Sequence, residues 1–239
     1  MDHTSLLFAE DFSGDVLNAT RWERCPEESR QGGAAIWADE MSFLDGEGHL
    51  VLRACWDADK ECVRSGAIRT KGLFEAGLGY YEASVKFPVA KGIWGAFWLM
   101  CGDVMRVSGT AADGVEIDIV ESINNEKGAY NFALHYDGYG ENLKSVKSGL
   151  QYDAPIYDGN FHLFGLDRGE DHYSFYIDGK EMWRVESRDC AVCREDGYLK
   201  LTVEAAAWAG SGTEDAIRAL PADMVVDYVR VYAKNPYEV

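Results

Sequence analysis

Three carboxylates stand close together in an otherwise apolar segment, at Glu116, Asp118 and Glu121. The segment, residues 114–122, is rich in β-branched residues, which favour a buried strand. Side chains alternate between the two faces of a strand, so Glu121 would fall on the face opposite the other two acids. A single-residue β-bulge near Ile119-Val120 would return Glu121 to their face. We therefore expect three acids on one face of a strand.

Crowded carboxylates of this kind suit glycoside hydrolysis. Like charges raise one pKa, so a protonated acid stands beside an ionised one. Retaining glycosidases use such a pair with the carboxyl groups ~5–5.5 Å apart. Glu116 and Glu121 are about four strand steps apart, or ~13 Å between Cα atoms, so their side chains would have to lean together. The alternative is an exposed edge strand with solvated acids, which the intervening apolar residues disfavour.

Length and composition indicate one all-β domain over residues 1–239. Gly is abundant at 25 residues and aromatic residues make up 13%, as expected for many short strands joined by tight turns. About a dozen strands in one domain imply two stacked antiparallel sheets. Strand patterns cover residues 50–54, 67–70, 80–87, 95–100, 115–121, 130–136, 161–166, 173–177, 181–185, 198–204 and 224–232.

The charge balance limits the partners. Forty-one acids against 23 bases give a net charge of −18 without a cluster of Lys or Arg, so we expect neither nucleic acid nor an anionic membrane as partner. No apolar run of about 18 residues is present, so no span of a membrane is expected. The start, Met1-Asp2-His3-Thr4, lacks a signal pattern. We expect a monomer, secreted or at the cell surface if a signal peptide has been removed and cytoplasmic otherwise.

Six cysteines leave the compartment open. Cys190 and Cys193 form a lone pair without a second pair or a suitably spaced His, which disfavours a zinc site. Cys55 and Cys62 flank a short polar segment and are candidates for pairing across a hairpin. Cys101 follows an apolar strand, where a reduced core thiol is ordinary. We expect mostly free thiols.

Several motifs resemble those of glycoside hydrolase family 16, in the same order and over nearly the whole chain. Glu-x-Asp-x-x-Glu is the bulged form of its signature, seen in laminarinase-like, agarase-like and carrageenase-like members. The resemblance implies a jelly-roll β-sandwich of two antiparallel sheets with a concave substrate cleft. The other matching segments are Phe8–Gly14, Leu17-Asn18, Trp22, Gly48–Ala54, Ser65–Thr70, Gly79–Ala83, Gly92–Leu99, Phe161–Leu166, Phe175–Gly179 and Val226–Tyr232.

The same resemblance implies catalytic roles. Glu116 would be the nucleophile and Glu121 the general acid/base, while Asp118 would tune the ionisation of its neighbours and stabilise charge on Glu116. The implied activity is that of a retaining endo-β-glycanase on a polysaccharide, first of all a β-1,3- or mixed-linkage glucan. No cofactor is required.

Candidate substrate-binding residues come from four segments. Trp94 and Trp98 are four residues apart on one strand and share a face, where they would stack on sugar rings or pack in the core. His135 would face the cleft if its strand neighbours the acidic one, and is otherwise structural. Trp208 lies on a loop-like segment that would border the cleft or join the core. Glu204 ends a strand where many glucan-active relatives carry apolar or amide residues, which leaves the substrate open.

A structural calcium on the convex face is known in several family members, so the resemblance makes Asp227 a candidate metal residue with backbone oxygens near Glu10 and Gly48. Asp227 lies inside an apolar strand and needs some partner. A hydrogen bond with the backbone is the alternative to a metal.

Other functions stay open at this stage. An endo-β-galactanase acting on agar-like, carrageenan-like or host galactans is suggested by Glu204 and the His-Tyr-Asp-Gly segment, although the acidic surface argues against heavily sulfated chains. A non-catalytic carbohydrate-binding sandwich is a further alternative, which an intact acid triplet disfavours. A transglycosylase would share the same acids.

Overall fold

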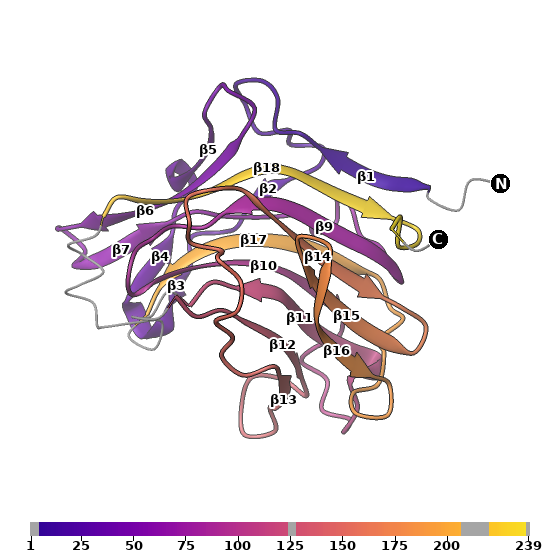
Figure 1. Cartoon of the computed structure of the whole chain (residues 1–239). Coiled ribbons are helices and arrows are strands. Elements are labelled where there is room, and N and C mark those ends of the chain that lie inside the picture. The colour runs from indigo at the N-terminus through magenta and orange to yellow at the C-terminus, as the bar shows by residue number, and fades with distance from the viewer. Residues whose placement is uncertain (1–4, 124–127, 207–219, 238–239) are drawn as a thin grey trace.

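Strands dominate the computed structural model, which describes residues 5–123, 128–206 and 220–237. They form two curved sheets stacked on one another, and the two ends of the chain lie on the same side of the molecule (Figure 1). The helices of the described ranges are short 3-10 turns at Gln31–Gly33, Asp39–Met41 and Ala111–Asp113. None of them has the length and apolar character needed to cross a membrane. The expected all-β sandwich is confirmed.

The larger sheet covers one side of the core. Its pairs are antiparallel except for β4 and β7, which run parallel, so the expectation of purely antiparallel sheets fails at this edge. Beside the main path of the sheet, β1 pairs with β18 and β5 pairs with β6. The main order is β16 (Lys180–Glu186), β15 (His172–Ile177), β14 (His162–Arg168), β9 (Gly79–Lys86), β18 (Ala222–Tyr232), β6 (Leu50–Asp57), β7 (Cys62–Ser65), β4 (Ala35–Trp37) and β3 (Ser29–Arg30), with β1 at Leu6–Glu10 and β5 at Ser42–Leu44.

The smaller sheet contains the acidic strand near its centre. Every pair in it is antiparallel. The order is β13 (Lys144–Lys147), β12 (Asn131–Tyr136), β11 (Gly114–Glu121), β10 (Ile93–Gly102), β17 (Gly197–Ala205), β8 (Ala67–Arg69) and β2 (Glu23–Arg24). Strand β11 therefore lies between β10 and β12, and the edge-strand alternative is wrong.

The core lies between the two sheets. Ile117, Ile119 and Val120 of β11 are fully buried in it, together with Phe164 and Leu166 of β14 on the facing sheet. Burial of such side chains contributes roughly 1.5–3 kcal/mol each, so the inner face of β11 is firmly held. The acids on its outer face are thus displayed by a rigid strand.

The cysteines are all free thiols. Cys55 lies opposite Arg64 in the β6–β7 hairpin, whereas Cys62 lies opposite Asp57. The pairing of Cys55 with Cys62 is therefore wrong, because the two residues are diagonal neighbours rather than directly opposed, too far apart for a disulfide. Burial raises the pKa of Cys101 to about 12, which keeps this core thiol protonated.

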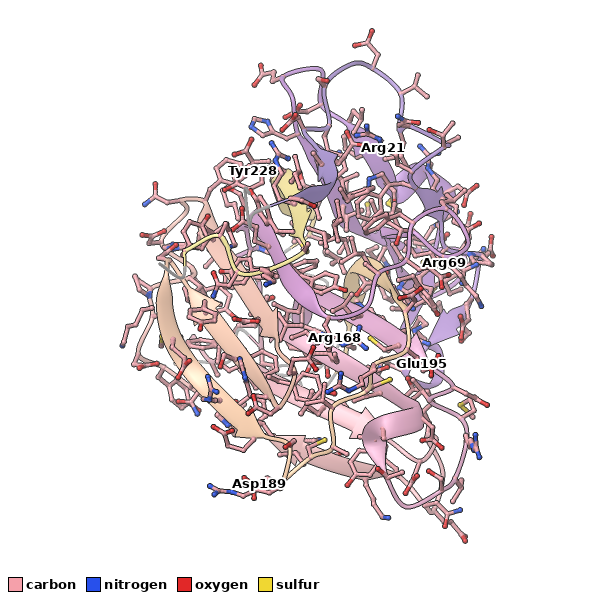
Figure 2. All side chains as sticks on the ribbon, turned by 90° about the vertical axis from the view of Figure 1, so that its right-hand side faces the viewer. Arg21, Arg69, Arg168, Asp189, Glu195 and Tyr228 are labelled. Atoms are coloured by element: carbon pink, nitrogen blue, oxygen red, sulfur yellow. The ribbon has the colours of Figure 1, made fainter. Side chains whose placement is uncertain are left out.

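A buried arginine ties the two sheets together. Arg168, at the end of β14, is fully buried and lies beside the segment that carries Glu195 (Figure 2). Its guanidinium donates hydrogen bonds to the carbonyl oxygens of Cys193 (3.1 Å), Gly77 (3.1 Å) and Glu195 (2.6 Å). Residues 193–195 lead into β17, so Arg168 fixes the position at which this strand of the smaller sheet begins.

Arg168→Met should therefore lower the free energy of unfolding by about 3 kcal/mol or more, because several buried carbonyl groups lose their donor at once. Urea unfolding followed by circular dichroism measures this change. Arg188→Met is the matched control, since its side chain is 81% exposed and its loss should change stability by less than about 0.5 kcal/mol. Equal midpoints for the two variants would contradict the anchoring role of Arg168.

Candidate functional site

The predicted bulge is present in β11. The register against β10 skips Ile119, because Asp118 and Val120 pair with consecutive residues of β10. Ile119 and Val120 both enter the core. Glu121 therefore returns to the outer face, where Glu116 and Asp118 also lie.

These acids line a cleft on the outer face of the smaller sheet, a cavity of about 460 Å³. A second cavity, also of about 460 Å³, shares Met100 and Tyr198 with it, so the hollow extends beyond the acids. Aromatic and charged side chains make up much of the remaining lining: Trp94, Trp98, Tyr139, Tyr198, Arg30, Arg69, Lys200 and Glu204.

Glu121 has the environment of a proton donor. Burial, with a further contribution from the Asp118 charge, raises its pKa from 4.5 to about 8. The side-chain amide of Asn131, the residue opposite on β12, donates to Oε2 at 2.9 Å. Near neutral pH the carboxyl group therefore keeps its proton and is held in one orientation.

Asp118 lies between the two glutamates and contacts an imidazole. It is buried, and burial together with the Glu116 charge raises its pKa well above the ordinary range. His135 Nε2 is 3.4 Å from Asp118 Oδ2, and Nδ1 is 2.7 Å from the Ser145 hydroxyl. Burial lowers the pKa of His135, which favours the neutral ring. His135 thus reaches the acids but does not line the cleft itself, so it would act through Asp118.

The donor atoms of Glu116, Asp118 and His135 all lie within 4.8 Å of one another. Oxygen and nitrogen donors at this spacing are close enough together to coordinate one divalent cation. Glu116 is also the carboxylate that would attack the substrate in a double displacement, so a cation bound there would compete with the reaction.

Tyr139 is a contact that sequence reasoning missed. Its hydroxyl donates a hydrogen bond to Oε2 of Glu116 and lies 3.4 Å from the sulfur of Met100. Burial of the hydroxyl and the adjacent Glu116 charge raise the pKa of Tyr139, so the group stays protonated and donates. The residue follows β12 in a loop, where strand periodicity gives no face.

The two tryptophans of β10 lie on the cleft side, as their shared face predicts. Trp94 and Trp98 pack with Ala96 in a cluster separate from the main core. Trp98 Nε1 donates to the Thr202 hydroxyl at 3.0 Å, and the Lys200 ammonium lies 3.8 Å from a ring centroid of Trp98. Since a cation covers that face of Trp98, a sugar would have to stack elsewhere in the cleft.

One end of the cleft is a network of buried charges. Lys200 is only 7% exposed and also lies 4.7 Å from the Trp37 ring, and burial lowers its pKa to about 8. Glu204, 2% exposed, accepts from Arg30 Nε at 3.2 Å and from Gln31 at 3.4 Å. Glu204 is therefore an ion-paired cleft residue rather than a free acid. Lys200 and Arg30 were missed because they come from segments far apart in the sequence.

Asp227 does not have the surroundings of a calcium site. Its carboxylate accepts a hydrogen bond from the Ser84 hydroxyl at 3.3 Å, so its partner is a side chain rather than the backbone. The carbonyl oxygen of Glu10, expected to help bind the ion, accepts from Arg230 Nη1 at 2.9 Å. A guanidinium at that oxygen opposes a second cation, so these residues do not fit calcium.

Trp208, the remaining candidate for substrate binding, lies outside the described residues.

The family model for glycosyl hydrolases family 16 matches residues 28–230, and the chain belongs to this family. Among curated proteins it is similar to glucan endo-1,3-beta-glucosidase A1 of Niallia circulans, at 25% identity over 97% of this chain and 38% of the relative. It is also similar to keratan-sulfate endo-1,4-beta-galactosidase of Sphingobacterium multivorum, at 25% identity over 95% of this chain and 54% of the relative. The chain thus spans about half or less of the length of these two relatives.

Among solved structures, the laminarinase catalytic domain from Thermotoga maritima MSB8 superposes with a TM-score of 0.79 and 26% identity. The match covers 97% of this chain and 98% of that chain. This agreement confirms the jelly-roll arrangement of the two sheets.

The raised pKa of Glu121 gives a stability prediction. Because the folded protein binds this proton more tightly than the unfolded chain, the contribution is fully present below about pH 4.5 and is lost as pH rises through about 8. Glu121→Gln cannot ionise, so its free energy of unfolding should rise relative to wild type between pH 5 and pH 9. Urea titrations at pH 5, 7 and 9 measure the difference.

Glu170→Gln is the matched control, since the Glu170 side chain is 74% exposed. Its free energy of unfolding should stay within about 0.5 kcal/mol of wild type at each of the three pH values. A constant difference for Glu121→Gln would show that the carboxyl group does not hold an extra proton in the folded protein.

Proposed function

We propose that this chain is a retaining endo-β-glycanase that cuts a β-1,3- or mixed-linkage glucan by double displacement. The observation that supports this most directly is the bulge, which puts Glu116 and Glu121 on the same face of β11 with Asp118 between them. The similarity to a glucan endo-1,3-beta-glucosidase and to a laminarinase catalytic domain favours glucan as the substrate.

In the first step, Glu121 gives its proton to the glycosidic oxygen while Glu116 attacks the anomeric carbon. The C–O bond to the leaving sugar breaks and a glycosyl ester with Glu116 forms. In the second step, Glu121, now ionised, takes a proton from water as the water displaces Glu116. Two inversions leave the product in the β configuration. The raised pKa of Glu121 supports the first role, since the donor must hold its proton near neutral pH.

Asp118 would tune this pair without reacting. Its charge is one cause of the raised pKa of Glu121, and its own raised pKa means that it competes with the glutamates for protons. One oxygen of its carboxyl group lies 3.4 Å from Nε2 of His135. Glu116 and Glu121 supply all the proton and bond chemistry, so we propose no cofactor requirement.

An open cleft suits cleavage within a polymer. The acids line a hollow that continues into a second cavity past Met100 and Tyr198, so chain can extend beyond the cleaved bond. The partner would be a polysaccharide. A monomeric state stays a prediction, as does a location that is secreted or at the cell surface if a signal peptide has been removed and cytoplasmic otherwise.

An endo-β-galactanase is the second candidate. The ion pair of Arg30 with buried Glu204 and the adjacent Lys200 give the cleft a charged end. The similarity to a keratan-sulfate endo-1,4-beta-galactosidase supports this reading. A binding module without catalysis would gain nothing from three crowded carboxyl groups.

Glu116→Gln and Glu121→Gln should each lower turnover by several orders of magnitude. General acid catalysis alone contributes roughly 10²–10⁴-fold, and loss of the nucleophile removes the covalent route. Reducing-end release from laminarin, mixed-linkage glucan, agarose, carrageenan, porphyran and mucin-type glycans measures both activity and substrate. Turnover within a few-fold of wild type in either variant would contradict the catalytic role of that glutamate. Release of reducing ends from a galactan alone would favour the second candidate.

The two glutamates can be told apart with azide and an aryl β-glycoside. In Glu121→Ala, Glu116 still forms the glycosyl ester, so azide should restore turnover and give the β-glycosyl azide. In Glu116→Gly, azide should enter the vacated space and give the α-glycosyl azide by a single inversion. Anomeric proton coupling in NMR distinguishes the products. The opposite pair of products would reverse the two roles.

A further inference from the structure

The loop after β12 makes a sharp turn at Asp137 and Gly138. Asp137 and Gly138 both have positive φ, 64° and 77°. Two successive left-handed residues turn the chain sharply, and a left-handed Asp is uncommon enough to need support from its surroundings. The turn brings the next residue, Tyr139, back over the outer face of the sheet and into the cleft lining.

The support comes from the Asp137 carboxylate, which is 2% exposed. It accepts hydrogen bonds from the backbone N–H groups of Ser108 and Gly109, each at 3.0 Å, and from Lys144 Nζ at 2.9 Å. The N–H of Gly138 donates to the Val104 carbonyl at 2.8 Å. The turn is thus held by hydrogen bonds to two neighbouring segments, which fix the position of the backbone just before Tyr139.

The Tyr139 hydroxyl then meets Glu116. In the part of the chain that the structure describes, it is the side-chain donor that hydrogen-bonds the Glu116 carboxylate. Glu116 is paired in register with Met100, whose sulfur lies 3.4 Å from the same hydroxyl. Glu121, in contrast, is held by Asn131 from β12. Each glutamate therefore has its own donor from a different element.

We infer that Tyr139 is a positioning residue for the nucleophile. Its hydroxyl holds Oε2 of Glu116 and leaves Oε1 free to attack the anomeric carbon. This inference rests on the proposed retaining mechanism.

A different role for Tyr139 is stacking of its ring on a sugar, because the residue is 49% exposed and lies at the rim of the cleft. Stacking needs the ring and not the hydroxyl, so it would affect KM. Positioning needs the hydroxyl and would affect kcat. Phenylalanine keeps the ring and removes the hydroxyl, so one substitution separates the two roles.

Tyr139→Phe should lower kcat on the best polysaccharide by roughly 10- to 100-fold, the usual effect of losing a hydrogen bond to a charged group, with KM within about 3-fold of wild type. Tyr176→Phe is the matched control, since Tyr176 donates to Glu181 at 3.3 Å on the larger sheet, away from the cleft. It should leave both readouts unchanged.

The anchored turn provides a second test. Asp137→Ala should release the loop and lower kcat in the same direction, and the double variant with Tyr139→Phe should lose little more than Tyr139→Phe alone. A kcat within 2-fold of wild type in Tyr139→Phe would overturn the inference, as would a change confined to KM. If Glu116→Gln keeps its activity, the proposed function itself fails, which is a separate result.

Discussion

The bulge at Ile119 is the constraint on which the site depends. Strand β11 must bury its apolar side chains against the larger sheet and also present three acids outward. With strict alternation, Glu121 would point into the core and Val120 would point outward. Skipping one residue sends Ile119 and Val120 together into the core. Burial of each contributes roughly 1.5–3 kcal/mol, so hydrophobic packing on one face determines the position of a carboxyl group on the other.

Once the acids share a face, their surroundings make them different. Glu121 is buried next to Asp118, holds a proton near neutral pH and is oriented by Asn131. Glu116 receives a hydroxyl hydrogen bond from the loop after β12. Repulsion between like charges destabilises the site, but it also prevents all three carboxyl groups from ionising together, which an acid and a nucleophile require.

The sequence predicts whatever depends on local periodicity. The strand, its bulge and the shared face of Trp94 and Trp98 all follow from alternation, so they could be derived before the fold was known. Contacts set by register or by loop shape could not be derived in this way. Tyr139 reaches Glu116 only through a left-handed turn, and the pairing of Cys55 with Cys62 fails because the hairpin register is offset by two residues.

The register across the smaller sheet also indicates where substrate choice is made. Asp118, Trp98, Lys200 and Arg69 lie in one row over four neighbouring strands. At ~4.8 Å between strands, Lys200 is about 10 Å across the sheet from Asp118.

In the proposed mechanism, Glu116 and Glu121 act on the bond to be broken and treat a glucan and a galactan alike. Discrimination between them has to come from groups that meet the neighbouring sugars. At this end of the cleft those groups are the Lys200 ammonium beside Trp98 and the ion pair of Arg30 with Glu204. Buried polar side chains that hydrogen-bond a sugar hydroxyl reject a sugar that lacks it far better than an apolar surface does, because they are then left unpaired. If the proposed mechanism holds, β17 and β3 would contribute to specificity, while β11 would carry the chemistry.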